Sequence, residues 1–317
     1  MTRTYMAESE EAALRAIVER IRRVPDVYRV FRQDTRDAGW HHGIEPPLLE
    51  ALMEAGLPFR RTGGTVRYDQ LDLANASLAL RMPSPRYLSM RGWSAAIRAT
   101  ANAPSTLTYE VEVKPSGRNG DPAAGLGAAP TTDSRLEPAA PLLARPECDS
   151  SADGSVTLTR TVHGQSTRVF PEAEAITNLV APIHFHLIPP ELRADLAFLA
   201  ESRLADCALA STFLVREAGA LGLRARRSFG LFLAAPYSIP HAWMELHIDG
   251  RWVSFDPHLL NLLGGWGLLP ADAWPANRSI GEAAWRLAAD EFVLATSGGV
   301  PTQLSFPTRA RDGQIGA

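Results

Sequence analysis

The stretch DCALASTFLVREAGALGLRARRSFGLFLAAPYSIPHAWMELHIDGRWVSFDPH, residues 206–258, decides the fold of this chain. Apolar residues recur at mostly helical spacing after Cys207. This spacing predicts a helix that starts at the cysteine and ends near Gly219 or Gly222. The rest of the stretch alternates between apolar and polar residues, as strands do. A helix followed by antiparallel strands predicts an α+β fold.

Three strands are expected after this helix. The first covers residues 224–233, the second is HAWMELHI at residues 241–248, and the third is residues 251–255. The dipeptide Asp249-Gly250 separates the last two strands and is a strong signal for a two-residue hairpin turn. A turn at this point brings the start of the second strand close to the end of the third.

The hairpin brings together residue types that suit nucleophilic catalysis. A helix N-terminus stabilises a thiolate such as that of Cys207, and a neighbouring imidazolium stabilises it further. His241 begins one strand and Asp256 ends its antiparallel neighbour, about two residues out of direct opposition and within cross-strand reach. A carboxylate on the second ring nitrogen would fix the orientation of the imidazole. The order therefore predicts Cys207 as nucleophile, His241 as acid and base, and Asp256 as orienting group.

Around residues 196–258 the sequence resembles the transglutaminase-like family, whose members share a papain-like core with a Cys–His–Asp triad. The resemblance rests on the helix-opening cysteine, on GLRAR at 222–226, on HAWME at 241–245, and on GRW at 250–252 followed by FDP at 255–257. It implies the same three catalytic residues and an acyl-thioester intermediate. It also implies that the chain needs no metal and no organic cofactor.

Some positions depart from the family pattern. Asp206 stands before the cysteine where the family often has glycine nearby, and His258 follows the Asp-Pro pair where the family often has threonine. Both positions shape the pocket, so Asp206 and His258, together with Trp243, are candidate substrate contacts. Glu201 occupies the place of a papain-like glutamine, and the tryptophan that transglutaminase relatives use has no evident counterpart.

Four segments are expected along the chain. Residues 1–113 form a helical and β-rich region, with amphipathic helices at 10–23 and 46–57 and strands at 65–82 and 106–113. Residues 114–154 are rich in Pro, Ala and Gly and predict a flexible loop, in which Cys148 has no role. Residues 155–190 continue the β-rich region, with a hairpin turn at His163-Gly164. Residues 191–317 form the catalytic core, beginning with a helix at 191–203.

Composition excludes several classes of protein. The formal net charge is −3, so a nucleic acid is not expected as the main partner. No apolar stretch has the length of a membrane span, and the N-terminal sequence lacks a signal-peptide core, so a cytoplasmic location is expected. Lys114 is the only lysine among the 32 basic residues, a bias typical of a GC-rich bacterial genome.

The expected function is cysteine-dependent acyl transfer. The donor would be a peptide, a protein side chain or a carrier-bound acyl group, and the acceptor an amine or water. An amide-forming role in bacterial small-molecule biosynthesis, a cysteine peptidase or amidase, and a thioester hydrolase all fit this chemistry. A non-catalytic binding or scaffolding member of the family is the rival. A metal-dependent hydrolase that uses His184 and His186 is a third alternative, although no carboxylate or thiol partner is evident beside them.

Overall fold

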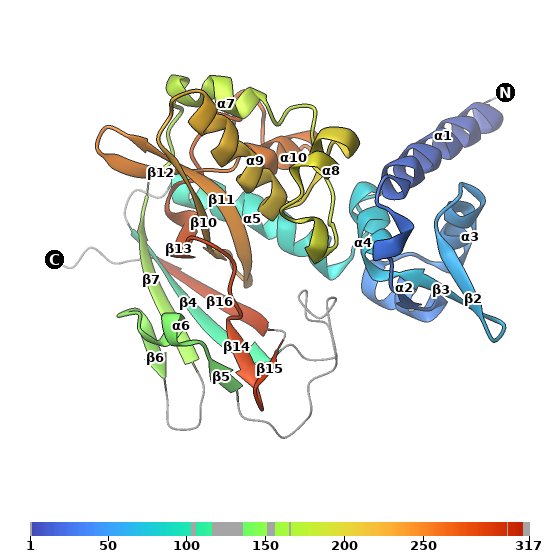
Figure 1. The fold of residues 1–317 in the computed structure, drawn as a ribbon, viewed down its shortest axis with the longest axis horizontal. Coiled ribbons are helices and arrows are strands. Elements are labelled where there is room, and N and C mark those ends of the chain that lie inside the picture. Colours follow the sequence, from blue (N-terminus) through green and yellow to red (C-terminus); the bar gives the residue numbers. More distant parts are fainter. Residues whose placement is uncertain are drawn as a thin grey trace. The chain divides into compact units, whose positions relative to one another are not determined.

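The structure is a computed structural model that describes residues 2–102, 106–115, 136–150, 156–164, 166–302 and 304–312. The chain divides into two compact units (Figure 1). The first comprises residues 1–88 and 186–206, and the second comprises residues 89–185 and 207–317. These units do not coincide with the four segments expected from composition, and that segmentation stays a prediction. Helices and antiparallel sheets occur together, so the expected α+β class is confirmed.

The first unit packs helices around a small sheet. Its strands β1 to β3 form an antiparallel sheet in the order β1-β3-β2. The apolar face of α1, with Ile17, Val18 and Ile21, belongs to the core that joins this sheet to α3 and α4. The elements of this unit are α1 (Thr2–Arg22), β1 (Phe31–Gln33), α2 (Thr35–His42), α3 (Pro46–Glu54), β2 (Phe59–Thr62), β3 (Thr65–Asp69), α4 (Gln70–Ala79), α8 (Leu196–Ser202) and β9 (Leu204–Ala205).

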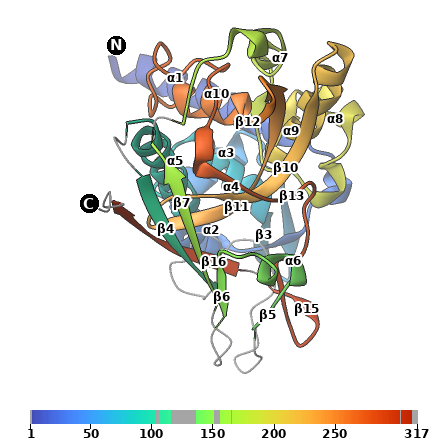
Figure 2. The same cartoon turned by 90° about the vertical axis from the view of Figure 1, so that its left-hand side faces the viewer.

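The second unit is built on a large curled sheet. Among the described residues, eight strands form this sheet in the order β13-β10-β11-β16-β4-β7-β6, with β12 paired to β11. Figures 1 and 2 show β4, β7 and β16 running side by side, as their register requires. The sheet strands are β4 (Thr106–Pro115), β6 (Cys148–Ser150), β7 (Val156–His163), β10 (Ala225–Phe232), β11 (Tyr237–Ile248), β12 (Arg251–Phe255), β13 (Ala284–Ala288) and β16 (Leu304–Asp312).

Helices and short strands complete this unit. Residues of α5 from Ser89 onward belong to it, and α9 packs against β10 and β11. A second, three-stranded sheet has the order β15-β14-β5. These elements are α5 (Pro85–Asn102), β5 (Leu136–Pro138), α6 (Ala140–Leu143), α7 (Glu174–Asn178), β8 (His184–Phe185), α9 (Cys207–Ala220), α10 (Pro257–Gly265), β14 (Ala295–Ser297) and β15 (Val300–Pro301).

The stretch that decides the fold is built as expected. Helix α9 begins at Cys207 and the chain turns at Gly222, where φ is +74°. Asp249 and Gly250 both have positive φ, which is the conformation of a type I′ hairpin turn. In the hairpin, Ile248 pairs with Arg251, and the pairing continues in register until Met244 of β11 lies opposite Phe255 of β12. The helix, the three strands and the turn between the last two are therefore confirmed.

Three expectations are wrong in part. Residues 65–82 are not one strand: β3 ends at Asp69, whose carboxylate accepts hydrogen bonds from the backbone of Leu71 and Asp72 and starts helix α4. Strand β7 pairs with β4 and β6, and among the described residues it pairs with no strand that follows Gly164, so the hairpin expected at His163-Gly164 is not seen there.

The segment 114–154 also differs from a continuous loop. Its described part contains β5, α6 and β6, and Leu142 of α6 is fully buried in the apolar core of the large sheet. Apolar anchors of this kind order a segment whose overall composition is rich in Pro and Ala. Residues 116–135 and 151–155 of the expected loop lie outside the described residues.

No helix in the described part of the chain is both long enough and apolar enough to cross a membrane.

Candidate active site

The structure brings Cys207, His241 and Asp256 together in the second unit. Cys207 is the first residue of α9, and its half-buried side chain packs against the edge of the main core. The same side chain is hydrogen-bonded to the ring of His241. The first N–H groups of α9 lack helical partners, as at any helix start, so they surround the sulfur with positive partial charge. This placement stabilises negative charge that develops on the sulfur during a reaction.

Asp256 holds the other side of the imidazole. Nε2 of His241 donates to Oδ2 of Asp256 at 2.5 Å, and both side chains are almost completely buried. The second oxygen, Oδ1, accepts from the backbone N–H of Leu259 at 2.9 Å and caps α10. Each carboxylate oxygen therefore has its own partner, which fixes the carboxylate and, through it, the ring. With Nε2 occupied, Nδ1 is the nitrogen left for the sulfur.

The register of the hairpin explains this contact. Met244 lies opposite Phe255, so the next residue along the chain, Asp256, comes level with Trp243. His241 lies two residues beyond Trp243 on the same strand, and side chains two residues apart share a face of the sheet. The expected offset of two residues is what the structure has.

The electrostatics of His241 differ from those of an ordinary buried histidine. Burial by itself lowers its pKa, but the neighbouring Cys207 and the hydrogen-bonded Asp256 outweigh burial and raise the pKa to about 10. The imidazole therefore keeps its proton at neutral pH. A protonated ring between a carboxylate and a sulfur favours an imidazolium–thiolate pair.

Three aromatic rings enclose the imidazole. The Trp243 ring stacks on it with centroids 6.4 Å apart and an interplanar angle of 17°. Phe232 of β10 meets it edge-on at 5.8 Å, and Trp93 of α5 lies 6.0 Å away. Within the described residues, the Nε1 groups of Trp93 and Trp243 are buried without a hydrogen-bond acceptor. Such N–H groups are costly to leave unsatisfied.

Strands β10 and β13 approach each other closely at the level of the His241 ring. Gly230 of β10 lies directly opposite His241 in the ladder. A Cβ at this position would lie 2.0 Å from the carbonyl oxygen of Trp285 in β13, so only glycine fits. The backbone of β13 can therefore press against β10 at the level of the imidazole.

The remaining motif residues support the scaffold. Glu245 of the HAWME segment pairs with Arg226 at 2.6 Å, and the Arg226 guanidinium lies 4.2 Å from the centre of the Trp252 ring. Arg227 pairs with Asp290 at 3.0 Å. Two arginines of this step, Arg226 and Arg227, thus have carboxylate partners.

The three candidate substrate contacts lie in less accessible places. Asp206 is buried, and its carboxylate pairs with Arg193 at 2.9 Å. Trp243 is only 1% exposed and supports the imidazole instead of offering a surface to a ligand. His258 is buried in the first turn of α10, with its ring 5.6 Å from that of Phe185. None of these three side chains is presented to solvent, and their contact with a substrate stays a prediction.

The other cysteine and the two-histidine motif do not form a second centre. Cys148 is half-buried against the apolar core of the large sheet, and burial together with Asp149 raises the pKa of its thiol, which disfavours its thiolate form. His184 is exposed, whereas His186 is buried. In the described ranges, no group of three or more His, Cys, Asp or Glu side chains is placed to hold a metal ion.

Sequence reasoning missed Trp93 and Phe232. Both contact the imidazole, but Trp93 comes from a helix far from the motif in the chain, and Phe232 ends a strand that reads as ordinary core. The signal that could have found Phe232 is its place on β10, two residues after the glycine that faces His241.

The comparisons with known proteins assign no family. No family model matches the sequence, and the comparison with curated proteins found no match. A solved structure from Cytophaga hutchinsonii, described as a "Putative Cysteine Protease", aligns with 67% of this chain and 92% of its own, at 14% identity and a TM-score of 0.31. A similarity at this level is too low to assign a family or an activity.

Proposed function

We propose that this chain is a cysteine-dependent enzyme that transfers or hydrolyses an acyl group through a thioester on Cys207. The observation that carries the proposal is the buried His241 ring, which bonds to Asp256 through Nε2 and to the Cys207 side chain on its other side. Protein interiors rarely accept a charged imidazole, and here its two neighbours raise its pKa despite burial. This is the arrangement that activates a thiol at neutral pH.

The reaction divides into two halves. The Cys207 thiolate attacks the carbonyl carbon of the donor, and the carbonyl oxygen takes up the negative charge. The backbone N–H of Cys207, which lies at the start of α9, stabilises that oxyanion in this proposal. The His241 imidazolium gives its proton to the departing amine, alcohol or thiol, which leaves an acyl thioester on sulfur.

In the second half, neutral His241 removes a proton from the acceptor as the acceptor attacks the thioester. An amine yields an amide, and water yields a carboxylic acid. The thiolate departs, and the proton held by His241 restores the starting ion pair. Asp256 keeps Nε2 protonated and the ring oriented throughout both halves.

The proposal covers an amide-forming transferase of the transglutaminase-like type, in line with the sequence motifs. It extends to a bacterial biosynthetic enzyme that takes acyl groups from a carrier. The second candidate is a hydrolase, which would be a peptidase, an amidase or a thioesterase. The two candidates share the thioester and differ only in the acceptor, so one donor assay with and without added amine separates them.

Intact-mass spectrometry tests the common step. The protein is incubated with a panel of N-acetylcysteamine acyl thioesters and short peptides, then analysed for a mass increase equal to the acyl group. We expect an adduct on the wild type and on Cys148→Ala, and none on Cys207→Ala. Cys148→Ala is the matched control because it removes the other thiol of the chain.

Two results would contradict the proposal. One is an adduct that persists in Cys207→Ala. The other is reversible binding of a panel member with no adduct and no turnover, which would indicate a non-catalytic binding protein. Iodoacetamide should abolish turnover and EDTA should leave it unchanged, whereas a metal-dependent hydrolase would show the reverse.

A further inference from the structure

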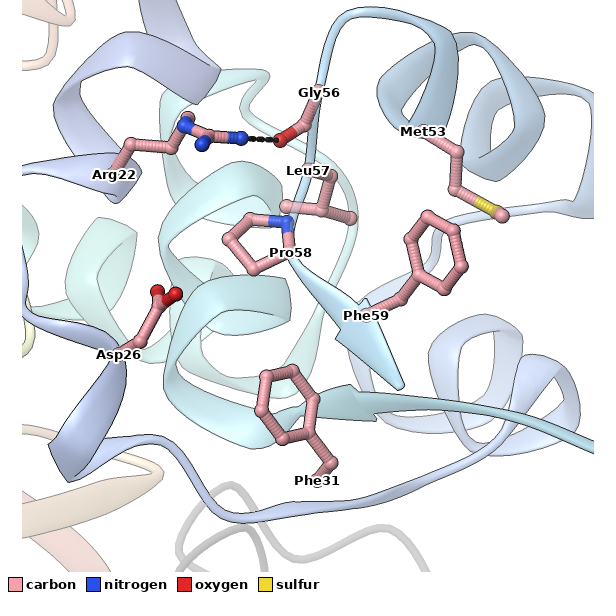
Figure 3. Close-up of a pocket in the computed structure, with 8 residues that line it drawn as sticks. All are labelled: Arg22, Asp26, Phe31, Met53, Gly56, Leu57, Pro58 and Phe59. Carbon is pink, nitrogen blue, oxygen red and sulfur yellow. Dashed lines mark hydrogen bonds between the residues drawn. The ribbon is translucent and has the colours of Figure 1, made fainter. Parts of the chain in front are cut away.

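A surface pocket of the first unit is unusual in its lining (Figure 3). Its volume is about 280 Å³. Phe31 of β1, Phe59 of β2 and Met53 of α3 contribute apolar side chains to its wall. Phe59 is 38% exposed although it is a large aromatic residue. Val27 and Val30, which shortly precede Phe31 in the chain, are exposed as well. An exposed aromatic ring beside a hollow is suited to contact with another molecule.

Arginines stand over the aromatic rings of this pocket. The Arg60 guanidinium lies 4.9 Å from the centre of the Phe31 ring, and that of Arg61 lies 5.7 Å from the centre of the Phe59 ring. Both arginines are exposed, and within the described part of the chain neither forms an ion pair with a carboxylate. A guanidinium that stacks on a ring keeps its N–H groups available and loses little freedom when it binds a carboxylate.

The charges that line the pocket, Arg22 and Asp26, balance, and the positive charge beside it comes from Arg60 and Arg61. Asp26 is the one carboxylate among the residues that line it, and it is paired with the buried Arg29. Arg22, which also lines the pocket, donates to the carbonyl oxygen of Gly56 at 3.0 Å and holds the rim in place, as Figure 3 shows. The arrangement complements a ligand that combines negative charges with an apolar group.

The neighbouring strand offers a backbone edge. All four residues of β2 are exposed, and in the described sheet β2 pairs only with β3. The pairing runs from Phe59 opposite Tyr68 to Thr62 opposite Thr65, so the other edge of β2 keeps its N–H and C=O groups open. An extended peptide can add to such an edge through main-chain hydrogen bonds.

We propose that this surface binds an extended acidic peptide segment of a partner protein. The segment lies along the open edge of β2 and packs one apolar side chain against Phe59, the exposed aromatic residue of that strand. Its carboxylates bind Arg60 and Arg61. The strand edge favours a peptide over a small carboxylate, because backbone pairing supplies contacts that a small molecule lacks. The proposal does not depend on the activity of Cys207.

Fluorescence anisotropy with a labelled heptapeptide, EEVFVEE, tests the proposal on the full chain. We expect saturable binding that weakens at 0.5 M NaCl, because the contacts between exposed charges are screened. The peptides KKVFVKK and EEVGVEE, and a form of EEVFVEE that is N-methylated at alternate residues, should each bind at least about tenfold more weakly, a loss of ~1.4 kcal/mol. Cys207→Ala should bind EEVFVEE as the wild type does.

Matched variants locate the site. Arg60→Glu, Arg61→Glu and Phe59→Ser should each weaken binding of EEVFVEE at least about tenfold. The controls are Arg36→Glu and Trp40→Ser, which change an exposed arginine and an exposed aromatic residue on α2. Both controls should retain wild-type affinity, and the melting temperature of every variant confirms that it is folded.

Three outcomes would overturn the proposal. The first is the absence of binding to the wild type at 1 mM EEVFVEE. The second is equal weakening by Arg36→Glu and Arg60→Glu, which indicates attraction by net charge alone. The third is full binding by the N-methylated peptide, which rules out pairing along β2.

Discussion

His241 and His42 are both buried histidines, one in each unit, yet their surroundings move the pKa in opposite directions. His241 is 3% exposed and its pKa is raised to about 10, whereas His42, at the end of α2, is 5% exposed and its pKa is lowered to about 3. Burial is nearly the same in the two places. The difference comes from what each ring faces.

The neighbours of His42 oppose a positive charge. Burial has the largest effect on its pKa, and the nearby His41 and Arg86 lower it further. Its Nε2 has no hydrogen-bond partner among the described residues. His241, in contrast, lies between a carboxylate and a sulfur that can both carry negative charge. Burial of a histidine is therefore a poor sign of function, and the charge of its partners is a better one.

The same substitution at both positions gives the largest expected effect. His241→Leu should lower kcat/KM for the acyl donor at least about 10³-fold, because the thiolate loses its partner and the leaving group its proton donor. His42→Leu should leave kcat/KM at the wild-type value, because His42 faces no reacting group. The measurement is steady-state turnover of the thioester that forms the adduct. Equal losses in the two folded variants would show that activity depends on stability and not on His241.

Replacing Asp256, the partner of His241, should lower the pKa of His241 toward that of His42. Asp256→Asn keeps an oxygen to cap α10 through Leu259 but removes the negative charge. The wild-type rate should hold through neutral pH and fall above about pH 10, where His241 loses its proton. Without the charge, the pKa of His241 falls, so the alkaline limb moves to lower pH and kcat drops about 10³-fold.

The pH–rate profiles of wild type and Asp256→Asn test this directly. An alkaline limb that stays in place in the variant would mean that Asp256 serves only to cap α10. A melting temperature close to that of the wild type would show that the cap survives and that the loss of rate comes from the charge.

The active-site hairpin could be predicted from the sequence because its determinants are local. Asp249 and Gly250 fix the turn, the turn fixes the register, and the register fixes the distance between His241 and Asp256. The position of Cys207 at a helix start follows from the spacing of apolar residues around it. Each step depends on neighbours within a few residues, which is the range over which patterns in a sequence are informative.

Other features depend on contacts that no local pattern contains. The ring of Trp93 contacts His241 from α5, a helix that is far from His241 in the sequence. The partners of His42 depend on how α2 packs. The strand expected over residues 65–82 was wrong for a different reason. Alternating apolar residues favoured a strand, but the Asp69 carboxylate binds the next free N–H groups and stabilises a helix. A single cap therefore outweighed the pattern.

The smallest expected effect concerns stability at acid pH. The pKa of His42 is lower in the folded protein than in the unfolded chain, so the unfolded chain binds a proton that the folded one does not between about pH 6.5 and about pH 3. The stability that neutral His42 contributes is therefore full above pH 6.5 and is lost as pH falls, at up to ~1.4 kcal/mol per pH unit.

His241 has the opposite sign: its raised pKa stabilises the folded form at neutral and acid pH and loses that effect as pH rises through about 10. From pH 7.5 to 5.0 the contribution of His42 falls by about 2 kcal/mol while that of His241 rises, so the change in the free energy of unfolding should differ by about 2 kcal/mol between the wild type and His42→Leu. Urea unfolding at both pH values measures this difference, and hydrogen exchange of peptides from α2 locates it. If the wild type and His42→Leu changed equally, another group would be responsible, and the contrast between the two histidines would no longer rest on their charge.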